Sequence, residues 1–344
     1  MQIKCYSAYQ QFRASGLIKA FDLFIAEHPH SNYFQSTAFL ELLEELPDYR
    51  GFVLLASDDN GVVKGALTGS LQTNGQGLKS WFSRRIIVYG GPVVEEESPV
   101  IASAILKHLI EFASKRAIYI EIRTLFDTSP MKSAFKAVGF EYRPHLNILV
   151  KTNDREALLG KISKSRLRQI KSSLKAGAAI SEPESREEVL AFYGILKSLY
   201  QEKVKKPLPG PELFLKLWKA AYGKLFLVKY DGQVVGGMAC PVFKNRVIYE
   251  WYVCGLDGRV KGVYPSVLAT WSAIDYALKN KLEYFDFLGA GPPDKDYGVR
   301  EFKARFGGEQ VNYGRYHLIL DKMLYRVGTL GLKAYKRVPA LFKV

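Results

Sequence analysis

Acidic and aromatic side chains in the second half of the chain could act on an amine or a carbonyl group. Asp286 lies in the apolar run EYFDFLGAG, just before glycines that favour a turn. A carboxylate there can take a proton from an amine or orient it, or it can simply stabilise the turn. Tyr249, Glu250 and Tyr252 lie on the preceding strand-like run, and Tyr297 lies on a later loop. They could contact a substrate, although packing in the core or between strands is the commoner use of such residues.

Basic side chains gather at three places where they could bind an anion. Arg84 and Arg85 precede the strand-like run IIVYGGPVV. Their guanidinium groups could bind phosphate through bidentate contacts, or they could be surface charges at the end of a strand. Lys205 and Lys206 occupy the loop KVKKPLPGP. A helix expected over 163–176 carries the densest basic stripe, for which binding to a nucleic-acid backbone and a solvated helix face are both open. Its members are Arg166, Arg168, Lys171 and Lys175.

Composition limits the class of protein. The 344 residues carry a formal net charge of +15, which favours an anionic partner such as nucleic acid, a phosphorylated metabolite or an acidic membrane surface. Three cysteines without a CxxC pair argue against a disulfide framework and for a reducing compartment. The five histidines are scattered, so no metal is expected. We find no GxSxG elbow, P-loop or GxGxxG motif, no signal peptide, and no apolar run long enough to span a membrane.

One pattern of elements occurs twice along the chain. This duplication predicts two domains of the same α/β class, with mixed, mostly antiparallel sheets flanked by helices. We expect a first domain over 1–150, a second over 151–321 with a helical insert at 152–222, and a basic tail over 322–344. The matched segments are hairpins 52–67 and 226–240, strands 85–89 and 247–253, helices 100–116 and 265–279, strands 118–125 and 282–289, and final strands 145–150 and 315–320.

This order of elements resembles the acyltransferase fold of the GNAT class, present twice. Two such units in one chain resemble the FemABX family of aminoacyl-tRNA-dependent peptidyltransferases, which add amino acids to the stem peptide of peptidoglycan precursors. The similar stretches are SNYFQSTAF (31–39), RRIIVYGGPVV (84–94), SKSRLRQIKSSLKAGAAI (163–180) and FDFLGA…DYGVREFKARFGGE (285–309).

The resemblance implies catalytic and substrate-binding roles for individual residues. It implies that Lys303, in the matching FK motif, contributes to the catalytic site, where a cation would stabilise the oxyanion of acyl transfer. Phe302 would line the acceptor channel, or is core. Lys136, the counterpart of Lys303 in the first half, is expected to be a solvated helix lysine. Lys205 and Lys206 fall where the family keeps basic residues near the precursor's phosphates.

Two departures from the family pattern, and one partial motif for a rival donor, bear on the substrates. The helix between the halves is short, whereas the best-known members carry a long coiled-coil arm. No lysine follows Gln35-Ser36-Thr37-Ala38-Phe39, where the family places one for the precursor's diphosphate. A rival donor, CoA, would bind a Gln/Arg-x-x-Gly-x-Gly/Ala loop at a helix N-terminus. The loop from Arg259 to Tyr264 matches it only in part, and Pro265 removes an N–H donor.

We therefore expect an aminoacyltransferase that moves an aminoacyl group from aminoacyl-tRNA to an amine of a peptidoglycan-precursor peptide or a related acceptor. It would need no cofactor and no metal, with aminoacyl-tRNA as co-substrate. The alternatives are an acyl-CoA-dependent N-acyltransferase on a sugar, lipid or amino-acid amine, and a non-catalytic RNA- or membrane-binding protein. We expect a cytoplasmic protein, with peripheral contact at the inner face of the membrane left open.

Overall fold

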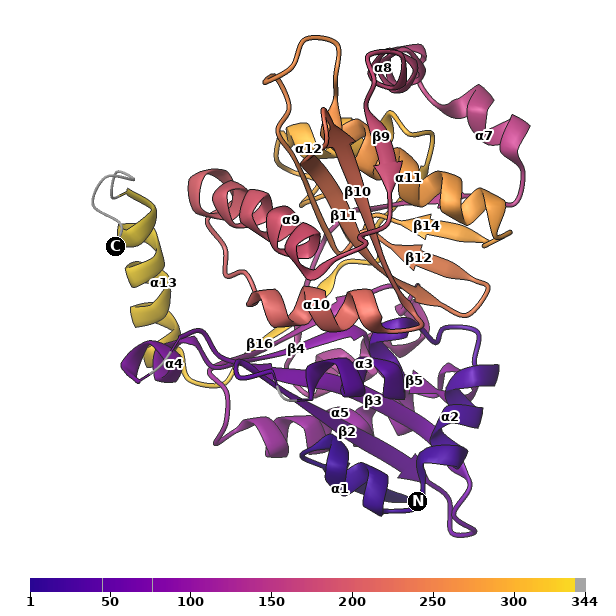
Figure 1. Cartoon of the computed structure of the whole chain (residues 1–344). Helices are drawn as coiled ribbons and strands as arrows, with labels where there is room; N and C mark the ends of the chain where they lie inside the picture. The colour runs from indigo at the N-terminus through magenta and orange to yellow at the C-terminus, as the bar shows by residue number, and fades with distance from the viewer. Residues whose placement is uncertain (45, 76, 338–344) are drawn as a thin grey trace. The chain divides into compact units, whose positions relative to one another are not determined.

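The computed structural model describes residues 1–44, 46–75 and 77–337, in which the chain forms two compact units (Figure 1). The first unit comprises Met1–Pro144 together with the segment from Tyr313 onward, and the second comprises His145–Asn312. Each unit is built on one mixed eight-stranded sheet.

The sheet of the first unit runs in the order β1-β2-β3-β4-β6-β16-β7, with β5 paired to β3. The neighbours β4 and β6 are parallel, and the other pairs are antiparallel. The strands are β1 (Gln2–Tyr6), β2 (Tyr49–Ser57), β3 (Val63–Gln72), β4 (Arg85–Gly90), β5 (Val93–Val94), β6 (Tyr119–Thr124), β7 (Glu141–Arg143) and β16 (Arg315–Ile319). The helices are α1 (Tyr9–Ala14), α2 (Ile18–Glu27), α3 (Thr37–Leu43), α4 (Leu78–Ser83), α5 (Pro99–Ala113), α6 (Lys132–Ala137) and α13 (Lys322–Arg337).

The sheet of the second unit runs in the order β15-β8-β14-β12-β11-β10-β9, with β13 paired to β11. Its parallel pair is β12–β14. The strands are β8 (Asn147–Lys151), β9 (Ala179–Ser181), β10 (Gly223–Tyr230), β11 (Gln233–Phe243), β12 (Val247–Tyr249), β13 (Tyr252–Gly255), β14 (Tyr284–Asp286) and β15 (Glu309–Val311). The helices are α7 (Arg155–Lys161), α8 (Lys164–Lys175), α9 (Arg186–Leu199), α10 (Pro211–Lys219), α11 (Pro265–Lys279) and α12 (Gly298–Ala304).

Local sequence signals account for the hairpins and the long helices. Asp231 and Gly232, at φ +49° and +70°, form the tight turn between β10 and β11, in the left-handed conformation that Asp and Gly tolerate. The predicted hairpin 226–240 is thereby confirmed, as is 52–67, which forms β2 and β3. The predicted helix 265–279 is α11, whose Pro265 begins the first turn without losing a hydrogen bond.

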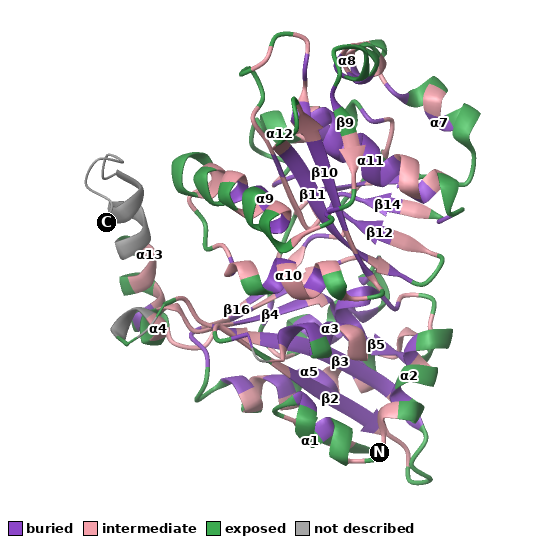
Figure 2. Ribbon diagram, in the orientation of Figure 1, coloured by how far each residue is buried: buried purple, intermediate pink, exposed green. Residues whose placement is uncertain are grey.

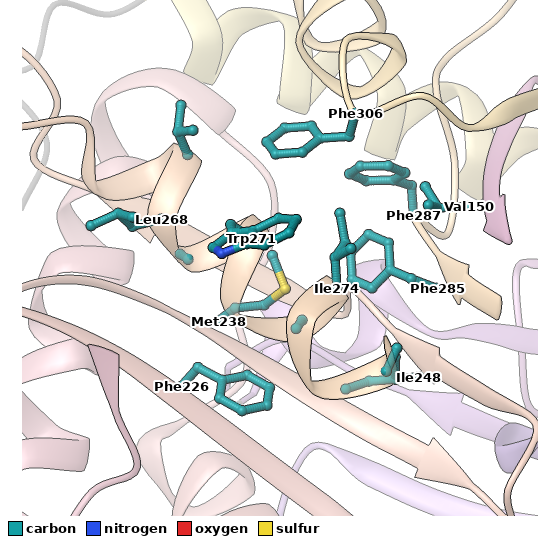
Figure 3. Packing of buried hydrophobic residues seen from close by; sticks show 14 of the residues in the cluster. Val150, Phe226, Met238, Ile248, Leu268, Trp271, Ile274, Phe285, Phe287 and Phe306 are labelled. Atoms are coloured by element: carbon teal, nitrogen blue, oxygen red, sulfur yellow. The ribbon is translucent and has the colours of Figure 1, made fainter. Parts of the chain in front are cut away.

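Each unit has its own hydrophobic core. In the second unit, α11 packs against the sheet, and the purple segments of α11, β10 and β11 mark the buried layer (Figure 2). Figure 3 shows Trp271 and Ile274 of α11 among Met238 of β11 and the rings of Phe285 and Phe287. Apolar residues recurring along α11 thus provide the face that covers the sheet.

The last strand of each predicted half belongs to the sheet of the other unit. The segment 145–150 was expected to close the first domain, but β8 lies between β14 and β15 of the second unit. The segment 315–320 was expected to close the second, but β16 lies between β6 and β7 of the first. This corrects the predicted boundaries 1–150 and 151–321. Both segments carry a similar apolar pattern, so local sequence does not determine which sheet each one completes.

The structure differs from the sequence prediction in two further segments, the strand 247–253 and the tail 322–344. The predicted strand 247–253 breaks at Glu250 and Trp251 into β12 and β13. The predicted tail 322–344 forms the helix α13 up to Arg337, despite two glycines that lower helix propensity, and it belongs to the first unit. Residues 338–344 of that tail lie outside the described residues.

Candidate active site

The ammonium group of Lys303 lies at the centre of a buried polar cluster in the second unit. Lys303 is in the last turn of α12 and is 8% exposed. Its Nζ donates to Phe287 O and to Gly289 O, each at 2.8 Å, and it pairs with Glu250 Oε1 at 2.9 Å. An ammonium group has three N–H donors, so these partners use all of them.

Glu250 enters this cluster because the strand breaks at that residue. Its N–H donates to Asp286 O at 2.9 Å, whereas the N–H of Trp251 donates to Ala239 O at 3.2 Å, so consecutive residues bond to different strands. The Glu250 side chain is 4% exposed, and within the described residues Oε2 is buried without a hydrogen-bond partner. Burial raises the pKa of Glu250, which Lys303 opposes and Asp286 reinforces.

Asp286 lies at the end of β14, next to the same cluster. Its Oδ1 accepts from Asn147 Nδ2 at 2.7 Å and from Leu288 N at 2.6 Å. Asn147 Oδ1 in turn accepts from Gly289 N at 2.7 Å, so two side chains hold the turn after β14. This support is needed because Leu288 has φ +52°, an unfavourable conformation for a leucine. Burial raises the pKa of Asp286 to about 6, against the opposing effects of its hydrogen bonds and Lys303.

Two carboxyl groups with raised pKa values beside one ammonium group suit proton transfer near neutral pH. Both are oriented by the protein: Glu250 by Lys303, and Asp286 by Asn147 and the β14 turn. The free oxygen of Glu250 gives the cluster an unused acceptor. The arrangement can therefore take a proton from a nitrogen nucleophile that reaches it.

Replacing Asp286 with asparagine tests this electrostatic environment. A pKa raised from 3.8 to about 6 means that the folded state binds the proton more tightly than the unfolded state, so the contribution of Asp286 to stability falls as pH rises from about 4 to about 6. Asparagine keeps an Oδ1 acceptor but has no charge. We expect Asp286→Asn to be more stable than wild type at pH 7, by up to about 3 kcal/mol, and equal to it near pH 4. Urea unfolding across this range measures the difference, and a difference independent of pH would contradict the raised pKa.

The structure separates the predicted RNA-binding residues. Arg166 is 6% exposed; its guanidinium lies 4.2 Å from the centre of the Phe302 ring and donates to Phe302 O at 3.4 Å. It is therefore a packing partner of α12, and its assignment to an RNA surface was wrong. Arg168, Lys171 and Lys175 are exposed along α8. They line a surface depression of about 510 Å³ with Lys164, Leu167 and Ser172.

The predicted tyrosines and lysines take varied positions. Tyr249 is buried on β12, opposite Asp286 in the strand register, and Tyr252 is half-buried against Phe214. Tyr297 is 42% exposed and covers Gly291, where an added Cβ would lie 2.7 Å from its ring. Lys205 is half-buried at the end of the π-helix Tyr200–Val204, and Lys206 is exposed.

Arg84 and Arg85 lie in the first unit and already have partners there. The Arg84 Nε donates to Trp81 O at 3.1 Å, and Arg85 Nη2 donates to Gln72 Oε1 at 3.2 Å. Lys136, expected to be a solvated lysine, is exposed on α6. Of the predicted catalytic residues, Lys303 and Asp286 lie in the buried cluster of the second unit, whereas the ring of Phe302 packs against Arg166 and Phe306.

Sequence reasoning undervalued Glu250 and missed Asn147. The signal for Glu250 was a single carboxylate within the apolar run VIYEWYV. Asn147 gave no signal, because its strand was expected in the first domain. Only the placement of β8 beside β14 puts its amide against Asp286.

The turn before α11, where CoA phosphates would bind in the GNAT resemblance, is engaged by groups of the chain itself. The N–H of Tyr264 donates to Ser173 Oγ at 2.9 Å, and Ser172 Oγ donates to Gly262 O at 3.0 Å. The N–H of Ser266 donates to Asp257 Oδ1 at 3.2 Å, and Pro265 has no N–H. A helix N-terminus binds phosphate through free N–H groups, and a carboxylate there repels it. This turn is therefore poorly suited to a pyrophosphate.

Comparison with known proteins identifies the domain that contains the cluster. Residues 164–303, which contain Glu250, Asp286 and Lys303, match the family described as acetyltransferase (GNAT) domain. Together with the fold, this match identifies a GNAT domain in the second unit and supports a transferase. A search of curated protein sequences found no match.

The fold of the chain, with its two units in tandem along the sequence, is similar to that of FemX. The FemX crystal structure aligns with 95% of this chain and 99% of its own at a TM-score of 0.68 and 16% identity, so the chain has a FemABX-like tandem GNAT fold. A tandem GNAT protein from the clavulanic acid biosynthesis pathway has a TM-score of 0.59 and 12% identity over 93% of this chain and 99% of its own. L-PGS from Bacillus licheniformis has a TM-score of 0.56 and 14% identity over 93% and 97%.

Residues 1–44, 46–75 and 77–337 also show two features that bear on membranes and metals. In that part of the chain, no helix combines the length and apolar character required to cross a bilayer. No group of three or more His, Cys, Asp or Glu side chains there is arranged to hold a metal ion.

Proposed function

We propose that this protein is an aminoacyltransferase that moves an aminoacyl group from aminoacyl-tRNA to an amine of a peptidoglycan-precursor peptide or a related acceptor. The observation that carries the proposal is the similarity to FemX over 95% of this chain and 99% of that one. The engaged turn before α11 supports a donor other than CoA, because the N–H of Tyr264 and that of Ser266 already have partners.

The buried cluster would act on the amine. The nitrogen forms a bond to the ester carbonyl carbon, the bond from that carbon to the ribose oxygen breaks, and the nitrogen loses a proton. Glu250 Oε2 is the free acceptor for that proton, which can pass on to the leaving ribose oxygen. The family resemblance implied that Lys303 stabilises the oxyanion, and the sequence predicted that Asp286 takes a proton from the amine or orients it. Because the N–H donors of Lys303 are all used, we propose that it positions Glu250 and that Asp286 helps to raise the pKa of Glu250.

The exposed basic face of α8, formed by Lys164, Arg168, Lys171 and Lys175, would bind the tRNA backbone. Its side chains follow one another at intervals of three or four residues, and phosphate contacts of this kind are sensitive to salt. We expect the double variant Arg168→Gln/Lys171→Gln to bind tRNA more weakly. Its plot of log affinity against log salt should be shallower by about one unit per lost contact.

Fluorescence anisotropy with labelled tRNA over a salt series measures this effect. Lys219→Gln, at an exposed position on α10 of the same unit, is the matched control and should behave as wild type. An unchanged salt slope in the α8 double variant would remove this face from the RNA-binding proposal.

The deciding experiment offers both kinds of donor to the purified protein. Radiolabelled aminoacyl-tRNAs, acetyl-CoA and longer acyl-CoAs are each incubated with a membrane-lipid and precursor extract, and label in an amine product is counted. Transfer from tRNA is the expected result and identifies the amino acid. Transfer from CoA alone would overturn the proposal in favour of an N-acyltransferase, the alternative that the GNAT match over 164–303 keeps open.

A further inference from the structure

The C-terminal helix α13 leaves an apolar stripe exposed. Met323, Val327 and Leu330 recur at intervals of four and three residues and are 69%, 48% and 64% exposed. The neighbouring face holds the helix to the first unit: Leu324 is buried, and the Tyr325 ring contacts the ring of Tyr119 at a centroid distance of 5.6 Å. The exposed stripe is therefore on a helix that is anchored rather than loose.

A second element adds aromatic side chains at the same place. Trp81 and Phe82 of α4 are 44% and 37% exposed, with ring centroids 5.0 Å apart. Helix α4 contacts α13, and a Cβ added at Gly328 would lie 3.5 Å from Phe82 O. Figure 1 shows the two helices together, although more than 230 residues separate them in the sequence. We call this the α4–α13 surface: Trp81, Phe82, Lys322, Met323, Arg326, Val327 and Leu330.

All charged residues of α13 are basic. Lys322 and Arg326 are exposed next to the apolar stripe, and the sequence of residues 322–337 contains five basic residues and no acid. Arg84 lies over the Trp81 ring at 5.1 Å. Trp and Phe beside Lys and Arg are the combination found where helices lie in the interface of a lipid bilayer.

We propose that the α4–α13 surface binds the anionic phospholipid surface of a membrane. The apolar stripe and the Trp81–Phe82 pair would enter the headgroup region, and Lys322 and Arg326 would contact the phosphates. A second copy of this chain would bring basic helices against each other, and RNA would leave the apolar stripe in water. Anionic lipid satisfies both the charge and the apolar area. This inference does not depend on the proposed acyl donor.

Vesicle flotation with the full chain tests the proposal. We expect the protein to float with vesicles of phosphatidylcholine mixed with phosphatidylglycerol, to stay unbound with phosphatidylcholine alone, and to be released in part by high salt. Equal binding to both vesicles, or to neither, overturns the proposal.

Matched variants assign the binding to this surface. Val327→Glu and Trp81→Ser should each lower the fraction bound at least fivefold, and Arg326→Gln should lower the affinity about fivefold. Leu23→Glu, at a 59% exposed position on α2, and Lys107→Gln, at an exposed position on α5, are the controls and should bind as wild type. Circular dichroism confirms that each variant is folded.

Two other outcomes overturn the proposal. If the folded variants bind anionic vesicles as wild type does, another surface is responsible. If they instead lose affinity for tRNA, or convert a dimer to a monomer in sedimentation, while vesicle binding is unchanged, the occupant of the surface is RNA or a second copy of the chain.

Discussion

Replacing Glu250 with glutamine is expected to lower the rate of acyl transfer by about 10²–10⁴-fold, the usual contribution of a general base. Glutamine has nearly the same shape, and its amide oxygen can still accept from Lys303, but an NH2 group replaces the free Oε2. The loss should fall on kcat rather than KM, because the proton moves only during the chemical step. The wild-type rate should also rise with pH as Glu250 ionises, and the variant should lack this rise.

The matched control is Glu283→Gln, an exposed position one residue before β14. It changes the same charge in the same unit outside the cluster and should leave kcat and the pH profile as in wild type. A Glu250→Gln variant that keeps the wild-type kcat and pH profile would remove Glu250 from the reaction.

Replacing Lys303 with methionine is expected to destabilise the second unit by about 3–5 kcal/mol at neutral pH, as is usual when one partner of a buried ion pair is removed. Methionine fills similar space but leaves the Glu250 carboxylate unpaired and the carbonyls of Phe287 and Gly289 without their donor. The penalty should shrink at acidic pH, where Glu250 and Asp286 take up protons and the uncompensated charge disappears. Urea unfolding at several pH values measures it.

A double-mutant cycle separates the ion pair from general damage to the helix. Lys303→Met/Glu250→Gln removes both charges and should recover a large part of the stability lost in Lys303→Met. Lys136→Met, on the exposed counterpart of Lys303, should change stability by no more than about 0.5 kcal/mol. Equal losses in Lys303→Met and Lys136→Met would show that the buried pair is not what Lys303 provides.

Local sequence predicted the elements well where turn and periodicity signals were strong. The Asp231–Gly232 turn and the Pro265 start of α11 are short-range features, and both lie where the pattern placed them. The repeat also predicted two α/β units of one class, which the family resemblance implied to be GNAT-like. The same resemblance singled out Lys303 through the FK motif, and Lys303 lies at the centre of a buried cluster.

Sequence predicted burial less well. Arg166 belonged to a regular basic stripe, yet it packs on Phe302 whereas Arg168 faces solvent. A stripe on a helix wheel indicates which residues share a face, but the neighbour that covers one edge of that face comes from another part of the chain. Here that neighbour is α12, more than 120 residues away.

The sequence by itself determined most of the order of helices and strands, the duplication, and Lys303 and Asp286 as the cation and one carboxylate of the cluster. The tertiary structure alone decided how they combine. Strands β8 and β16 have similar apolar patterns, and each completes the sheet of the unit to which the repeat did not assign it. That exchange puts Asn147 against Asp286, and the break after β12 turns Glu250 toward Lys303. Strand pairing joins residues distant in sequence through backbone groups that every residue carries, so side-chain pattern alone cannot specify the partner.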